Sequence, residues 1–112
     1  MVVDQRSDAD IDRVFQALAD ATRRDIVSRV TSSEFTVSGL ASLYTMSFAA
    51  VQKHVAVLER ASLVTKEKRG REQIVRGNHE GLAKARRLLD EYEALWRQRA
   101  GRIADILNEQ QE

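Results

Sequence analysis

Cysteine and proline are absent from this 112-residue chain, and glycine occurs only five times. The absence of cysteine excludes a thiolate metal site and fits a protein of the cytosol. No stretch is apolar and long enough for a membrane span or a signal peptide, so we expect a cytoplasmic protein with no membrane contact. The sequence also lacks a glycine-rich phosphate loop, a serine elbow and paired carboxylates in an apolar setting. We therefore expect neither an enzyme nor a bound cofactor.

No glycine- or serine-rich linker and no internal repeat divides the chain, so we expect one domain over residues 1–112. The net charge is only +1, but it is distributed unevenly. Residues 36–77 hold seven Lys or Arg against three Glu, while residues 1–35 and 78–112 are slightly acidic. Positive charge is thus concentrated in the middle of the chain, where it can serve nucleic-acid phosphates.

The pattern of residues 47–60 predicts an amphipathic helix whose exposed face suits DNA. Ser47 is a favourable N-cap, and Val51, Val55 and Leu58 form one apolar stripe at helical spacing. The opposite face holds mostly small or hydrogen-bonding side chains: Ser47, Phe48, Ala49, Gln52, Lys53 and Ala56. Such a face can approach base edges closely and donate hydrogen bonds to them. The alternative is that these polar residues form only a solvated helix surface.

The neighbouring sequence predicts the remaining parts of a helix-turn-helix followed by a β-hairpin. Thr36 can cap a helix that extends through Tyr44 and leaves residues 45–46 as the turn. Residues 63–77 read as a strand, a turn around Gly70 and a second strand, with positive charge at the tip. Together these elements fit duplex DNA, with the second helix in the major groove and the hairpin against the backbone.

A family resemblance is carried by four segments: LADATRRDIVSRV, TVSGLA, MSFAAVQKHVAVLERASLV and KRGREQIVR. They resemble the ArsR/SmtB group of bacterial winged-helix repressors over roughly residues 11–107. The resemblance implies a mainly α-helical winged helix-turn-helix fold of about five helices and a two-stranded wing. The helix-turn-helix would occupy residues 36–60 and the wing residues 63–77. It also implies a homodimer that binds double-stranded operator DNA.

The residues expected at the DNA come from the helix-turn-helix and from the wing. They are Thr36, Ser38, Ser47, Phe48, Ala49, Gln52, Lys53, His54, Lys68, Arg69 and Arg71. The resemblance places residues 47–60 in the recognition helix, while the three wing cations would contact phosphates. His54 has two interpretations, because it either contacts a phosphate or a base or packs partly buried against the domain.

Some positions depart from the family pattern. Gly39 stands where Glu often completes a capping box with Thr36, which weakens the start of that helix by about 1 kcal/mol. Thr45 stands where glycine often makes the turn, and a positive φ there would strain a β-branched residue. The cysteines of a metal-sensing site are missing. In the last helix His79 has only Asp and Glu residues as possible further ligands, so we expect no metal site.

Mostly apolar residues in steps of three and four, from Leu82 to Ile106, form a heptad-like seam. This seam predicts one long C-terminal helix over residues 79–108, roughly 45 Å long at 1.5 Å per residue. A chain of this size cannot cover such a helix alone, so we expect it to pair with a second copy, helped by the first helix. The expected dimer residues are Ile11, Val14, Phe15, Leu82, Leu89, Tyr92, Trp96, Ile103 and Ile106. The alternative is that the helix packs entirely on its own domain. Nearer the N-terminus, Asp20 is expected to cap a second helix.

The sequence therefore predicts a homodimeric transcriptional repressor that binds an inverted-repeat operator, with recognition helices roughly 34–36 Å apart. Repression rather than activation is implied by the resemblance alone. Two alternatives stay open: a winged-helix module that binds another protein, and a metal-responsive repressor with a non-cysteine site. The operator, the regulated genes and the inducing ligand are not identified by the sequence.

Overall fold

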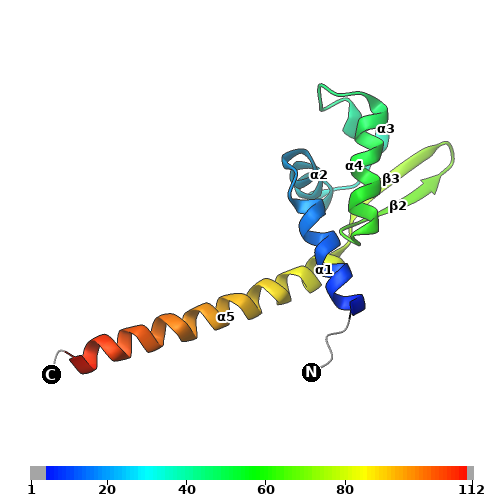
Figure 1. Ribbon diagram of the computed structural model, residues 1–112. Coiled ribbons are helices and arrows are strands. Elements are labelled where there is room, and N and C mark those ends of the chain that lie inside the picture. Colours follow the sequence, from blue (N-terminus) through cyan, green and yellow to red (C-terminus); the bar gives the residue numbers. More distant parts are fainter. Residues whose placement is uncertain (1–4, 111–112) are drawn as a thin grey trace. The chain divides into compact units, whose positions relative to one another are not determined.

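The computed structural model describes residues 5–110, with side chains described for residues 9–109, and this range contains five helices and three strands (Figure 1). In chain order they are α1 (Gln5–Leu18), α2 (Ala21–Ser32), β1 (Phe35–Thr36), α3 (Val37–Ala41), α4 (Phe48–Arg60), β2 (Val64–Arg69), β3 (Glu72–Gly77) and α5 (His79–Gln110). The chain divides after Leu82 into two compact units. The first unit holds the helices and strands through the first turn of α5, and the second is the remainder of α5.

Three helices begin at the N-caps that the sequence predicted. Each cap accepts a hydrogen bond from the backbone amide three residues later: Asp20 Oδ1 at 3.0 Å, Thr36 Oγ1 at 2.8 Å and Ser47 Oγ at 3.1 Å. These contacts satisfy amides that have no partner within the first turn of a helix. The starts of α2, α3 and α4 are therefore encoded locally.

The sheet has one strand more than the predicted two-stranded wing. β2 and β3 form an antiparallel hairpin from the Val64–Gly77 pair to the Arg69–Glu72 pair, closed by Gly70 at φ 65° and by Arg71. The added strand, β1, pairs with the other edge of β3, so the order is β1-β3-β2. Thr36 is both the last residue of β1 and the N-cap of α3, which ties the hairpin to the helix-turn-helix.

The helix before the turn is shorter than predicted. α3 ends at Ala41 rather than including Tyr44, and residues 42–47 form the connection instead of residues 45–46 alone. Among the described residues only Ser62 combines a side chain with a positive φ, of 61°, so the strain considered for Thr45 does not arise. The helix ends early because the Ser42 hydroxyl donates to a carbonyl of α3 at 2.7 Å and Tyr44 turns back toward α2.

A polar contact holds this connection against α2. The Tyr44 hydroxyl donates to Asp25 Oδ2 at 2.5 Å, and Arg29 Nε donates to the same oxygen at 2.8 Å. The Arg29 guanidinium also lies 5.9 Å from the centre of the Tyr44 ring. Burial, followed by the hydrogen bond to Asp25, raises the pKa of Tyr44 to about 12. Tyr44 is therefore a neutral donor that fixes the longer turn.

The apolar core lies in the first unit and contains the predicted stripe of α4. Val51, Val55 and Leu58 are at most 1% exposed, and they belong to one buried cluster with residues from α1, α2, α3, β2 and β3. Leu82 and Val14, expected at a dimer interface, pack against this cluster of their own chain. The first turn of α5 thus contributes to the core, and contact of these two partly buried residues with a second copy stays a prediction.

The first turn of α5 is fastened to the end of α4. Asn78 Nδ2 donates to the Ser62 carbonyl at 2.9 Å, and the Asn78 amide donates to the Leu63 carbonyl at 3.0 Å. A Cβ added at Gly81 would lie 1.7 Å from the Ser62 carbonyl oxygen. Glycine is therefore required at position 81 by the close approach of two backbones.

The remainder of α5 exposes many large apolar side chains. They are more than half exposed, from 52% at Ile103 to 68% at Trp96, and comprise Leu89, Tyr92, Leu95, Trp96, Ile103, Ile106 and Leu107. Across the part of the chain that the structure describes, no helix combines the length and the apolar character that a membrane crossing requires.

Candidate nucleic-acid interface

The exposed face of α4 carries the predicted base-reading side chains. Ser47, Phe48, Ala49, Gln52 and Lys53 are all exposed, and Phe48 is 47% exposed despite its apolar ring. The opposite stripe of the same helix is fully buried, so α4 is held firmly while this face stays open. A Gln amide and a Lys ammonium can donate to base acceptors, and an apolar ring can contact a thymine methyl group.

His54 lies to the side of this face and is half-buried. Its Nδ1 is 3.3 Å from Arg23 Nη1, and the same guanidinium donates from Nε to the Ala17 carbonyl at 2.8 Å. Arg23 also supplies the amide that Asp20 caps, and that hydrogen bond lowers the pKa of the Asp20 carboxyl. His54 is therefore partly buried beside Arg23, and its contact with a phosphate or a base stays a prediction.

Two residues expected at the DNA belong to the start of α3, and they differ in exposure. Ser38 is exposed on α3. Thr36 is half-buried, and its hydroxyl accepts from the Gly39 amide at 2.8 Å as the helix cap. Thr36 therefore has a structural task that explains its presence without any DNA contact.

The tip of the hairpin presents two free cations. Lys68 and Arg71 are exposed, and neither has an ion pair within the described part of the chain. Gly70, at φ 65° with nothing within 4 Å of an added Cβ, makes the tight turn between them. Unpaired cations at an exposed tip suit the sequence-independent attraction to phosphates.

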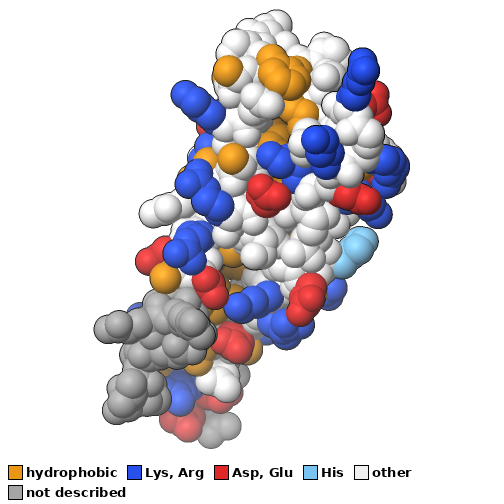
Figure 2. Space-filling model, turned by 90° about the vertical axis from the view of Figure 1, so that its right-hand side faces the viewer, with side chains coloured by type: hydrophobic (Ala, Val, Ile, Leu, Met, Phe, Trp, Pro, Cys, Tyr) orange, Lys and Arg blue, Asp and Glu red, His pale blue; other side chains and the backbone are white. Residues whose placement is uncertain are grey.

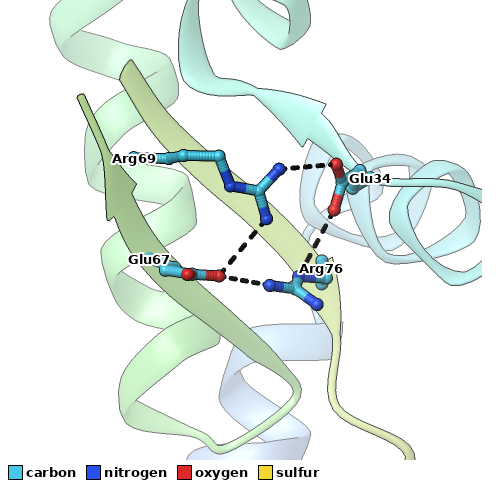
Figure 3. A network of polar contacts seen from close by, with 4 residues as sticks. All are labelled: Glu34, Glu67, Arg69 and Arg76. Atoms are coloured by element: carbon cyan, nitrogen blue, oxygen red, sulfur yellow. Dashed lines mark hydrogen bonds and ion pairs between the residues drawn. The ribbon is translucent and has the colours of Figure 1, made fainter. Parts of the chain in front are cut away.

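Arg69, the third predicted wing cation, is instead held in a network of four charged side chains (Figure 3). Its Nη1 contacts Glu34 Oε1 at 3.0 Å and its Nη2 lies 3.5 Å from Glu67 Oε2. Arg76 completes the ring through Nε, 3.5 Å from Glu34 Oε2, and through a close contact with Glu67. The hydrogen bond to Glu34 raises the pKa of Arg69 above its ordinary value. A phosphate contact of Arg69 would therefore compete with two carboxylates, unlike one of Lys68 or Arg71.

Sequence reasoning missed Glu34 and Arg76 as members of this site. Glu34 lies 35 positions before Arg69, and nothing local marks β1 as a strand that brings it to the wing. The one available signal was alternation: positions 67, 69 and 76 fall on the same face of the predicted hairpin. Oppositely charged neighbours on one face of a hairpin predict cross-strand pairing.

The positive charge on this side of the protein is interrupted. On the face drawn in Figure 2, Lys and Arg side chains are widely spread and acidic side chains lie between them. The face drawn therefore carries individual cations rather than one continuous basic patch. Within residues 9–109, no three His, Asp or Glu side chains come together as metal ligands.

The chain is similar in sequence and in fold to known transcriptional regulators. No family model matches the chain. The HTH-type transcriptional regulator Rv2034 of Mycobacterium tuberculosis is 40% identical over 81 residues, which cover 72% of this chain and 76% of that protein. The solved ArsR-like transcriptional regulator from Rhodococcus sp. RHA1 is 33% identical, with a TM-score of 0.77, 89% of this chain covered and 94% of that chain.

A third solved protein is similar in fold. The homodimeric winged helix-turn-helix DNA-binding domain Mb0332 from Mycobacterium bovis is 22% identical, with a TM-score of 0.65, and the match covers 84% of this chain and 89% of that one. The relatives are transcriptional regulators, in agreement with the expectation that the chain is not an enzyme. The similarity to them and the winged helix-turn-helix described above together show that this chain belongs to the ArsR family of DNA-binding transcriptional regulators.

Proposed function

We propose that the chain acts as a homodimeric repressor that binds an inverted-repeat operator. In this proposal α4 enters the major groove, where Gln52 and Lys53 meet base edges, while Lys68 and Arg71 contact the phosphate backbone. The observation that carries the proposal is the exposed face of α4, which is mostly small or polar and lies opposite a stripe that is fully buried. Because a DNA-binding regulator acts where the DNA is, we also propose a cytoplasmic location.

The proposed dimer forms through the exposed apolar side chains of α5, with Phe15 of α1 contributing. Trp96 and Tyr92 are 68% and 59% exposed. Large apolar side chains that lie open to water along one helix mark a surface that binds a partner. Burying such side chains contributes about 1.5 to 3 kcal/mol each, which is enough to drive association. The proposed dimer is also supported by a protein of similar fold, since the Mycobacterium bovis domain is homodimeric.

Sedimentation of the wild-type chain and of Trp96→Ala tests the dimer directly. We expect the wild type to sediment as a dimer at micromolar concentration. The dissociation constant of the variant dimer should be higher by roughly tenfold or more. Glu91→Ala, which changes a polar exposed residue of the same helix, is the matched control. A wild-type monomer at all concentrations would contradict the proposed assembly.

The DNA proposal is tested by a gel shift on an operator selected from random duplexes. Gln52→Ala or Lys53→Ala should weaken operator binding by about 1 to 3 kcal/mol if the residue meets a base edge. Arg71→Ala should weaken binding to all duplexes alike and flatten the salt dependence. Arg87→Ala, an exposed cation of α5, controls for the loss of one charge. Unchanged affinity in all three interface variants would remove the proposed docking and favour a protein-binding module.

A further inference from the structure

The four-residue charged network lies on the face of the sheet that points away from the core. Ile74 is only 5% exposed, yet it is not a member of the main buried cluster. Its partner across the hairpin is Glu67, while Arg69 and Arg76 lie two positions away along β2 and β3 on the same face. The charged side chains and Ile74 therefore share one face of the sheet, with Glu67 directly opposite Ile74.

This network is electrically neutral, because two carboxylates balance two guanidiniums. Arg69 stands directly before the Gly70 turn, at the end of the wing that carries Lys68 and Arg71. Its side chain is 52% exposed, so solvent and ligands can reach it. Two carboxylates already occupy its guanidinium, however, and a phosphate must displace them to bind there.

We propose that Glu34 holds Arg69 in this network and thereby limits the strength with which the wing attracts phosphates. The proposal rests on the proposed docking of the wing on DNA and adds a positioning residue that lies outside the helix-turn-helix and the hairpin. When Glu34 is neutralised, Glu67 is the one carboxylate left in the network, and Arg76 holds it in the closer contact. Arg69 then keeps only its 3.5 Å contact with Glu67, and a phosphate displaces it more easily. Glu34 therefore sets the number of cations that the wing offers to DNA.

The effect is independent of DNA sequence, because a phosphate contact carries no base information. Each additional neutralised phosphate steepens the plot of log affinity against log salt by about 0.9. Glu34→Gln is the informative change, since it removes the charge and keeps the shape. An exposed ion pair contributes little to stability, so we expect the variant to fold normally.

The experiment compares Glu34→Gln, Arg69→Gln and the double variant with the wild type in gel shifts at four salt concentrations. Glu34→Gln should tighten binding about two- to fivefold near physiological salt and steepen the salt plot by about 0.9. The gain should be equal on the operator and on an unrelated duplex. Arg69→Gln alone should change affinity less than twofold, and in the double variant the gain should disappear.

Glu72→Gln is the matched control, because Glu72 is an exposed wing carboxylate with no ion pair within the described residues. An equal gain in Glu72→Gln, or a gain that persists in the double variant, would overturn the proposal in favour of a general charge effect. A marked loss of affinity in Arg69→Gln alone would also overturn it. Lys68→Gln and Arg71→Gln separate the two hypotheses: if they weaken binding while Glu34→Gln has no effect, only the role of Glu34 is lost.

Discussion

Replacement of Gly81 by alanine should destabilise the first unit, although the same change favours a helix elsewhere. The added Cβ would lie 1.7 Å from the Ser62 carbonyl oxygen and 2.7 Å from its carbon, and both are backbone atoms. Contacts below 3.0 Å are essentially never seen for real Cβ atoms, so the two backbones must separate by about 1.3 Å or more.

The cost of this separation can be worked from the contacts that it breaks. Overpacking a well-filled site costs about 1 to 3 kcal/mol. The two hydrogen bonds from Asn78 to Ser62 and Leu63 contribute about 0.5 to 1.5 kcal/mol each. The helix propensity of alanine returns about 0.5 to 1 kcal/mol. We therefore expect Gly81→Ala to lower the free energy of unfolding by about 1 to 5 kcal/mol.

Gly101→Ala is the matched control, since Gly101 lies in the same helix with nothing within 4 Å of an added Cβ. It should raise stability by about 0.5 to 1 kcal/mol. Urea unfolding followed by circular dichroism, at one fixed protomer concentration, measures both variants under conditions that any association affects equally. The reasoning is refuted if Gly81→Ala is as stable as Gly101→Ala.

Two further predictions concern the helix caps and the turn of the helix-turn-helix. Asp20→Ala should lower the free energy of unfolding by about 0.5 to 2 kcal/mol at pH 7, while Asp20→Asn, which keeps an acceptor, should lose little; equal losses in urea titrations would contradict the capping role. Because the folded pKa of Tyr44 is raised to about 12 from an ordinary value near 10, its stabilising contribution is complete below about pH 10 and is lost as the pH rises toward 12. The difference in stability between wild type and Tyr44→Phe should therefore shrink between pH 10 and 12, and a constant difference would show that this hydroxyl does not titrate as described.

Local chemistry explains which elements could be predicted from the sequence. The caps Asp20, Thr36 and Ser47 and the stripe on α4 depend on residues within one or two turns, so their pattern is visible along the chain. Gly70 is likewise a local signal, because a tight turn with positive φ favours glycine. The ArsR-family relationship was also accessible, since each of the four segments that carry it is a continuous stretch of sequence.

The features that were missed depend on contacts between distant segments. β1 is two residues long, too short for any alternation to appear, and it exists because β3 offers a free edge. The pairing of Glu34 with Arg69 follows from that strand and could not be predicted without it. The heptad-like spacing of α5 begins at Leu82, which packs against the core. Periodicity alone does not distinguish such a core contact from a contact with a second chain.

Thr36 makes the chain unequally tolerant of insertions and deletions. One residue ends β1, pairs with Ile74 and caps α3, so a deletion just before it would shift the strand by one position and turn each side chain to the opposite face. Glu34 and Phe35 would then exchange sides, and a carboxylate would be forced toward the core. At the Gly70–Arg71 tip nothing lies within 4 Å of a Cβ added at Gly70. An engineered loop or tag is therefore better tolerated there than between α2 and α3.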